Sequence, residues 1–144
     1  MNVNDDELRQ MLSLMETYKN RVEAMTRQAT VLRSTLDEIN MANESVKALM
    51  AANEGDEILI PIGASSFMNV KVPSNKNIIV GVGSGISVEK SPEDASAFME
   101  ANAAEVSEAL KKTVDALQEV QKALSTISEA VQIEYSNRQQ AQMQ

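Results

Sequence analysis

The chain has 144 residues, with thirteen basic and twenty-one acidic side chains and a formal net charge of −8. The basic residues are scattered rather than clustered, so we expect no nucleic-acid partner and no anionic membrane partner. Cys and His are both absent, which removes disulfides, thiolate zinc sites and the commonest general base near neutral pH. We therefore expect no enzyme activity, no catalytic residue, no metal site and no cofactor.

Aromatic residues are scarce, with two Phe, two Tyr and no Trp. Aliphatic residues, Ala and Met must therefore supply the buried surface, which suits narrow helix–helix seams. The acidic N-terminal residues lack the apolar stretch of a signal peptide. No apolar run approaches the roughly 20 residues that a membrane helix needs. We expect a soluble protein of the cytoplasm.

Residues 1–54 are predicted to form a long coiled-coil helix. Asn4 is suited to cap its start, and Glu7 stands where a capping box requires it. Gly55 is the expected left-handed cap at the other end. The heptad pattern predicts a seam, and Asn43, which interrupts it, is interpreted as a register-setting polar residue or a looser place near the middle of the chain. The seam residues are Leu8, Met11, Met15, Tyr18, Val22, Met25, Ala29, Leu32, Leu36, Ile39, Asn43, Val46 and Met50.

Residues 55–90 are predicted to form two β-hairpins. The first pairs 57–62 with 67–72, where Pro61 indicates an edge or a bulge, and the second pairs 78–82 with 86–89. The glycine-rich stretch 81–85 is interpreted as a turn, because a strand rather than a phosphate-binding helix follows it. Four short strands have open edges and too little apolar area to stand alone, so we predict that they assemble with other subunits into a β-barrel or sandwich hub. The predicted oligomerisation residues are Ile58, Ile60, Ile62, Phe67, Met68, Val70, Val72, Ile78, Val80, Val82, Ile86 and Val88.

Residues 91–137 are predicted to form the second coiled-coil helix, with Ser91 as its cap and Pro92 in its first position. The apolar pattern stops after Val131, because the next seam positions are Glu134 and Arg138. Residues 138–144 are expected to be a frayed polar tail. The fold class is α+β: a long antiparallel two-helix coiled coil, joined through two β-hairpins that form an oligomeric hub.

Two stretches resemble the α-class subunit of prefoldin. Residues 60–67 (IPIGASSF) are similar to the Val-Pro-x-Gly-x-Gly-x-Phe hairpin of that family, with Ser65 where Gly is frequent. Residues 79–91 (IVGVGSGISVEKS) resemble the second hairpin and helix start, and two hairpins rather than one indicate the α class. The resemblance implies an ATP-independent co-chaperone in a hexamer of two α and four β subunits. Its partners would be prefoldin β-type subunits, non-native polypeptides and a group II chaperonin.

The free end of a two-helix seam has no third element to cover it, so we predict that client polypeptides bind there. Leu12 and Ile133 lie off the main seam, whereas seam residues have the simpler alternative role of packing against each other. A structural tether that binds one defined partner is the alternative function. A carboxylate-based enzyme is disfavoured, because the hairpin region holds no cluster of acids. The predicted client-binding residues are Leu8, Met11, Leu12, Met15, Ile127, Val131, Ile133 and Tyr135.

Overall fold

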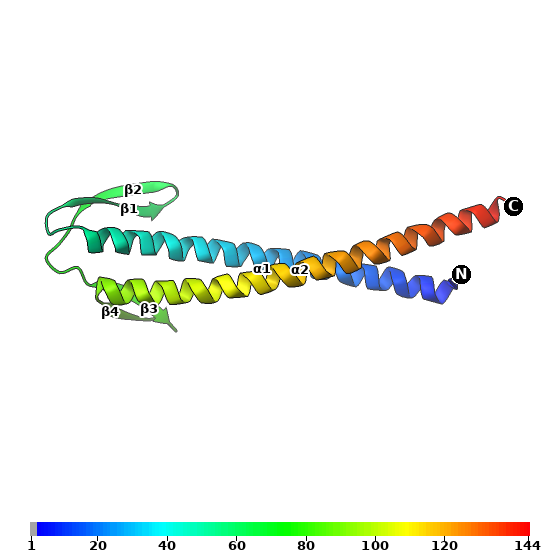
Figure 1. The fold of residues 1–144 in the computed structure, drawn as a ribbon, viewed down its shortest axis with the longest axis horizontal. Coiled ribbons are helices and arrows are strands. Elements are labelled where there is room, and N and C mark those ends of the chain that lie inside the picture. Colours follow the sequence, from blue (N-terminus) through cyan, green and yellow to red (C-terminus); the bar gives the residue numbers. More distant parts are fainter. Residues whose placement is uncertain (1–2) are drawn as a thin grey trace. The chain divides into compact units, whose positions relative to one another are not determined.

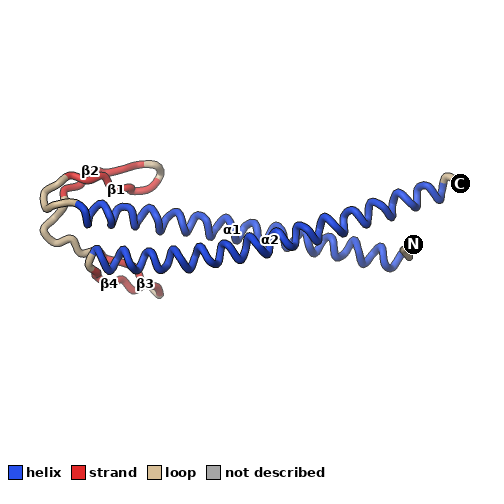
Figure 2. Tube along the Cα trace, viewed as in Figure 1, coloured by secondary structure: helices blue, strands red, loops and turns tan. Residues whose placement is uncertain are grey.

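The computed structural model describes residues 3–144 and contains two long helices and two β-hairpins (Figure 1). Figure 2 shows that loops are confined to the connections between these elements and to the chain ends. The predicted order of helix, paired hairpins and helix is confirmed. The elements are α1 (Asp5–Ala51), β1 (Glu57–Gly63), β2 (Ser66–Lys71), β3 (Ile78–Gly83), β4 (Ile86–Lys90) and α2 (Pro92–Gln142).

The chain divides into two compact units. The first, which we call the terminal unit, comprises Met1–Val31 and Leu110–Gln144. The second, which we call the hairpin unit, comprises Leu32–Ala109. Each unit therefore contains one part of α1 and one part of α2, and all four strands belong to the hairpin unit.

Both helices begin as the sequence predicts. The Glu7 amide donates to Asn4 Oδ1 over 2.8 Å and the Asn4 amide donates to Glu7 Oε2 over 3.1 Å, which is a complete capping box. At the start of α2 the Asp94 amide donates to Ser91 Oγ over 3.1 Å, and Pro92 occupies the first helical position. These bonds satisfy amides that would otherwise have no partner within the helix.

The end of α1 differs from the prediction. The helix stops at Ala51, and Gly55 lies in a separate turn with a φ of 86°, so it is not the helix cap. The Gly55 amide donates to the Val72 carbonyl and the Val72 amide to the Asp56 carbonyl, both over 2.8 Å. This turn is therefore tied to the end of β2. The Lys76 ammonium group donates to the Ala52 carbonyl, where a positive charge stabilises the end of the preceding helix.

The end of α2 also differs from the prediction, because the helix continues through the expected tail to Gln142. Arg138 explains the extension, since its guanidinium group bonds both to α2 itself and to the first turn of α1. A polar residue at a seam position thus continues the helix pairing rather than ending it.

The two hairpins have the same construction. In the first, Ile58 pairs with Val70, and the register shifts between Pro61 and Gly63, which confirms the bulge indicated by Pro61. In the second, Val80 pairs with Val88, and the register shifts at the equivalent place beside Gly83. Each is a separate two-stranded sheet, and Figure 1 shows β1 and β2 beside the end of α1 and β3 and β4 beside the start of α2.

The core of the hairpin unit is small. Val46, Val80 and Ala95 are buried together, and Ile78, Phe98 and Met99 pack partly buried around them. Within residues 3–144 no large side chain is completely removed from solvent. The scarcity of aromatic residues thus produces thin packing between helices and strands, as the composition predicts.

Asn43 belongs to a polar network between the two helices of the hairpin unit. Ser96 Oγ donates to Asn43 Oδ1 over 2.8 Å, and both residues are buried. Asn43 Nδ2 donates to Glu100 Oε1 over 3.5 Å, and Lys47 Nζ lies 3.4 Å from the same oxygen. A satisfied buried pair of this kind favours one register of the two helices, which supports the interpretation of Asn43.

Ser65→Gly should stabilise the protein. Ala64 and Ser65 have φ values of 49° and 56°, in the left-handed region, which costs a residue with a side chain about 1–2 kcal/mol. Because glycine loses more entropy on folding, we expect a net gain of about 0.5–1 kcal/mol in the free energy of unfolding. Chemical denaturation at fixed protein concentration measures this change in the free energy of unfolding. The control, Ser87→Gly within β4, should destabilise, and a loss of stability in Ser65→Gly would contradict the turn geometry.

Asn43→Leu should lower the free energy of unfolding by about 1–3 kcal/mol, because the buried Ser96 hydroxyl loses its acceptor. The double variant Asn43→Leu/Ser96→Ala should recover most of this loss, since both polar partners are then gone. A double-mutant cycle in chemical denaturation measures the coupling. Equal stability of the single variant and the wild type would show that the bond is unimportant.

Candidate functional site

The two ends of the chain meet in the terminal unit. Arg138 donates from Nη1 to Asp5 Oδ1 over 2.7 Å and from Nη2 to the Val3 carbonyl over 3.0 Å. Its Nε donates to Glu134 Oε1 over 2.7 Å. We call Glu134, Arg138 and Asp5 the tip ion-pair cluster, and residues 3–15 with 127–142 the tip. The cluster confirms the antiparallel pairing of the two helices at this end.

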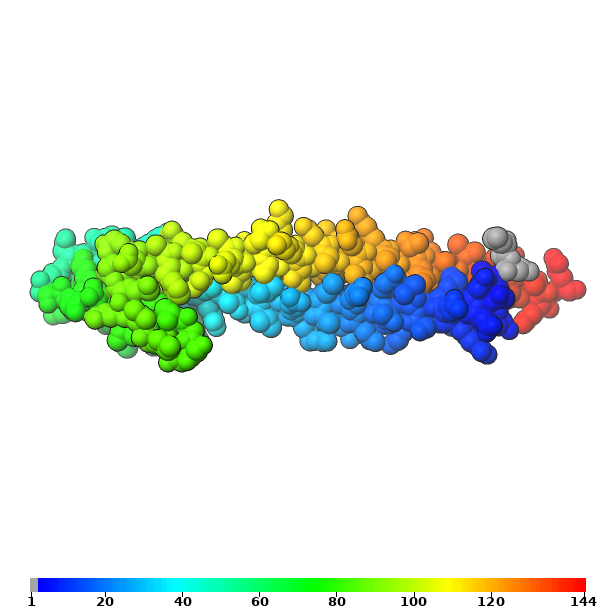
Figure 3. Space-filling view, turned by 90° about the horizontal axis from the view of Figure 1, so that it is seen from below, coloured from blue at the N-terminus to red at the C-terminus, as the bar shows by residue number. Residues whose placement is uncertain are grey.

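The electrostatics of the cluster keep Arg138 charged. The hydrogen bond that Arg138 donates to Glu134, and then the one that it donates to Asp5, raise the pKa of Arg138 above its ordinary value, because each carboxylate stabilises the guanidinium form. Figure 3 shows the start of α1, in blue, packed along the end of α2, in orange to red.

The predicted client-binding residues fall into three groups at the tip. Leu8 and Val131 are buried between the helices, so in this state they pack the seam. Ile133 is 61% exposed, and Tyr135 is exposed as well. The others, which are half-buried, are Met11, Leu12, Met15 and Ile127. Of the two residues that lie off the main seam, Ile133 is open to solvent and Leu12 is half-covered.

Within residues 3–144, three exposed large apolar residues of the terminal unit are absent from the predicted set: Leu14, Val31 and Met143. Leu14 lines a shallow groove of about 400 Å³ with Tyr18, Ala123, Thr126, Ile127 and Ala130. The small side chains of Ala123 and Ala130, seven residues apart, leave this hollow on α2. A large apolar residue outside the heptad seam was the available signal for Leu14.

The predicted oligomerisation residues also divide by exposure. Val72 and Val80 are buried against the helices of the hairpin unit. Ile58, Ile60, Val70 and Ile78 are half-buried. The remaining members are exposed and lie near the turns of the hairpins; they are Ile62, Phe67, Met68, Val82, Ile86 and Val88.

Two further apolar residues, Leu59 and Ile79, lie on the opposite strand faces, and Ile79 is 76% exposed. Apolar residues at successive strand positions indicate burial on both faces. This signal was present in the sequence at residues 58–60 and 78–80.

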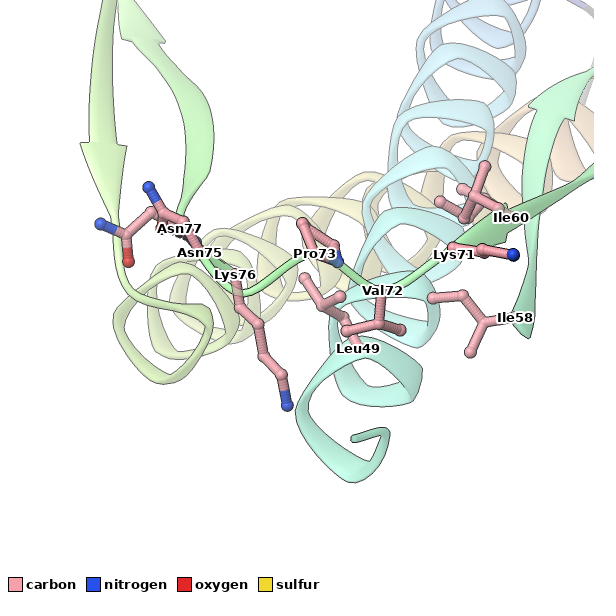
Figure 4. A pocket seen from close by; sticks show the side chains of 10 residues that line it. Leu49, Ile58, Ile60, Lys71, Val72, Pro73, Asn75, Lys76 and Asn77 are labelled. Carbon is pink, nitrogen blue, oxygen red and sulfur yellow. Dashed lines mark hydrogen bonds between the residues drawn. The ribbon is translucent and has the colours of Figure 1, made fainter. Parts of the chain in front are cut away.

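Two apolar hollows adjoin the hairpins. One, of about 280 Å³, is lined by Leu49, Ile58, Ile60 and Val72 among others (Figure 4). The second, of about 270 Å³, shares Leu49, Ile58 and Ile60 and reaches Ile78 and Met99. A single chain thus leaves apolar side chains of both sheets incompletely covered.

Within residues 3–144, no group of three or more acidic side chains is arranged to hold a metal ion. Neither of the described helices has a segment apolar enough and long enough to span a membrane.

Comparison with known proteins identifies the family. The prefoldin subunit family matches residues 18–137. Prefoldin subunit alpha of Pyrococcus horikoshii is 33% identical over 126 residues, which cover 82% of this chain and 85% of that protein. Prefoldin subunit alpha of Methanothrix thermoacetophila is 32% identical over 108 residues, 75% of this chain and 71% of that protein. A cryo-EM structure of filamentous PFD from Methanocaldococcus jannaschii is 20% identical, with a TM-score of 0.49 over 85% of this chain and 95% of that chain. The chain belongs to the prefoldin family, as an α-class subunit.

Proposed function

We propose that this chain is an ATP-independent co-chaperone subunit that holds non-native polypeptides at its tip and delivers them to a group II chaperonin. Family membership supports the co-chaperone role. The observation that carries the tip assignment is the exposure of Leu14, Ile133 and Tyr135 in the unit where the two chain ends meet. Large apolar side chains that no other element covers are suited to an unfolded partner. The proposed role requires no catalytic chemistry and belongs in the cytoplasm.

The same proposal assigns the hairpins to assembly with β-type subunits, in a hexamer of two α and four β subunits. The exposure of Ile79 and Phe67 supports it, because strands with apolar residues on both faces require a covering layer on each side. Partner strands and partner side chains would supply that layer.

Weak binding at each tip is sufficient for this function. Methionines such as Met11 and Met15 adapt to differently shaped partners, because the thioether side chain is flexible and polarisable. Several tips that contact one client raise the overall affinity through effective concentration, without any new contact. Release to another chaperone stays possible, because each contact can dissociate separately.

A structural tether is the alternative function. Aggregation assays with several unrelated denatured proteins discriminate the two: a co-chaperone protects many of them, whereas a tether protects one or none.

The triple variant Leu14→Ser/Ile133→Ser/Tyr135→Ser should weaken client capture at least about tenfold, since each half-exposed apolar side chain contributes about 1 kcal/mol when covered. Suppression of client aggregation at graded concentrations measures this effect. Val31→Ser is the control, because Val31 is an exposed apolar residue of the terminal unit outside the tip. Full protection by an intact triple variant would refute the tip assignment.

Ile79→Lys should prevent assembly, because the ammonium group would be buried without a partner at the subunit interface. Native electrophoresis with a β-type subunit should show the variant unassembled, while circular dichroism retains the helical signal. Ser74→Lys adds the same charge in the exposed loop after β2 and should assemble normally. Normal assembly of Ile79→Lys would exclude this strand face from the interface.

A further inference from the structure

The tip ion-pair cluster occupies seam positions where apolar residues would be expected. Glu134 and Arg138 are the next seam positions after the buried Val131, and the Glu134 side chain is only 6% exposed. A buried ion pair is often no more stabilising than apolar residues of similar volume. Removal of one partner, in contrast, is strongly destabilising, because it leaves an uncompensated charge. Closure of the seam at this position therefore depends on the bonds of one side chain, Arg138.

The contacts between the helices in this cluster are made by one side chain. Arg138 is 35% exposed and reaches Asp5, whose side chain is 80% exposed. It also binds the Val3 carbonyl, directly before the capping residue of α1. Water and ions have access to the Asp5 side of the cluster, so this contact is weakened by competing charges more readily than apolar packing is.

Release of Arg138 would have a defined consequence. The Glu134–Arg138 pair within α2 would then lack its contacts to Asp5 and the Val3 carbonyl, and hydration of this charged pair would favour separation of the helix ends. Leu8 and Val131 are the nearest buried apolar residues of the same seam, so they would become accessible.

We propose that the tip ion-pair cluster holds the end of the seam closed and that its release adds Leu8 and Val131 to the client-binding surface. This inference rests on the proposed function, since it concerns the regulation of the same tip. Ile133 and Tyr135 provide the permanent part of the surface, and the seam residues provide a part that is available only in the open state. The closed and the open state of the tip thus differ in the apolar area that is exposed for client binding.

Arg138→Gln in the full-length assembled protein tests the closed state directly. We expect amide hydrogen exchange in residues 5–12 and 127–138 to accelerate about tenfold or more, because local opening no longer has to break the cluster. Client capture should increase in parallel, and assembly through the hairpins should be unchanged. Arg9→Gln is the matched control: it removes the same charge from the first turns of α1, where Arg9 pairs with Asp6 on the exposed surface.

The double variant Glu134→Leu/Arg138→Leu tests the opposite direction. It extends the apolar seam by two positions, so exchange at the tip should slow and client capture should fall below that of the wild type. Higher salt should accelerate tip exchange in the wild type and leave this double variant unaffected.

Three results would overturn the proposal. Unchanged tip exchange in Arg138→Gln would show that the cluster does not hold the seam closed. Faster exchange with unchanged or reduced capture would show that opening does not supply client-binding surface, although the proposed function would stand. Failure of the wild type to capture any client would end both proposals, and the exchange measurements would then describe a purely structural ion pair.

Discussion

The structure depends on the fact that one chain cannot cover both faces of its own hairpins. The helices of the hairpin unit bury Val72 and Val80, while Leu59, Phe67 and Ile79 remain exposed. Apolar burial is the dominant favourable term in folding, at about 25 cal/mol per Å², so uncovered strands of this composition favour association with other chains. The scarcity of large apolar and aromatic side chains also accounts for the small core around Val46 and Ala95. The chain has enough apolar residues to stabilise two long helices, because a coiled-coil seam needs only a narrow line of them.

Each unit contains a polar interaction within its helix seam, and the two interactions differ in character. Asn43 and Ser96 are neutral, buried and directly bonded, which suits a permanent choice of register. Glu134 and Arg138 are charged, and the contact with α1 runs through the exposed Asp5. Salt and competing ions weaken the second kind of contact far more than the first. A fixed seam in the hairpin unit and a releasable seam at the tip are what the proposed assembly and the proposed client binding require, respectively.

Local signals in the sequence were sufficient for the helix starts and the hairpins. Asn4 with Glu7, and Ser91 with Pro92, act within a few residues, so their roles follow from spacing alone. The sequence did not reveal the role of Arg138, because its partner Asp5 lies 133 residues away and two polar seam positions imitate the end of a helix. The end of α1 was misplaced for a similar reason. Gly55 has the expected left-handed backbone. Its amide donates to the carbonyl of Val72, which follows β2, so Gly55 belongs to a separate turn and does not cap α1.

The mass of the native protein, measured alone and with a β-type prefoldin subunit, tests most directly whether the uncovered hairpin faces require other chains. We expect a small or heterogeneous species for the chain alone and a uniform hexamer after mixing. A uniform monomer that ignores the added subunit, with the strand amides already protected from hydrogen exchange, would contradict this expectation.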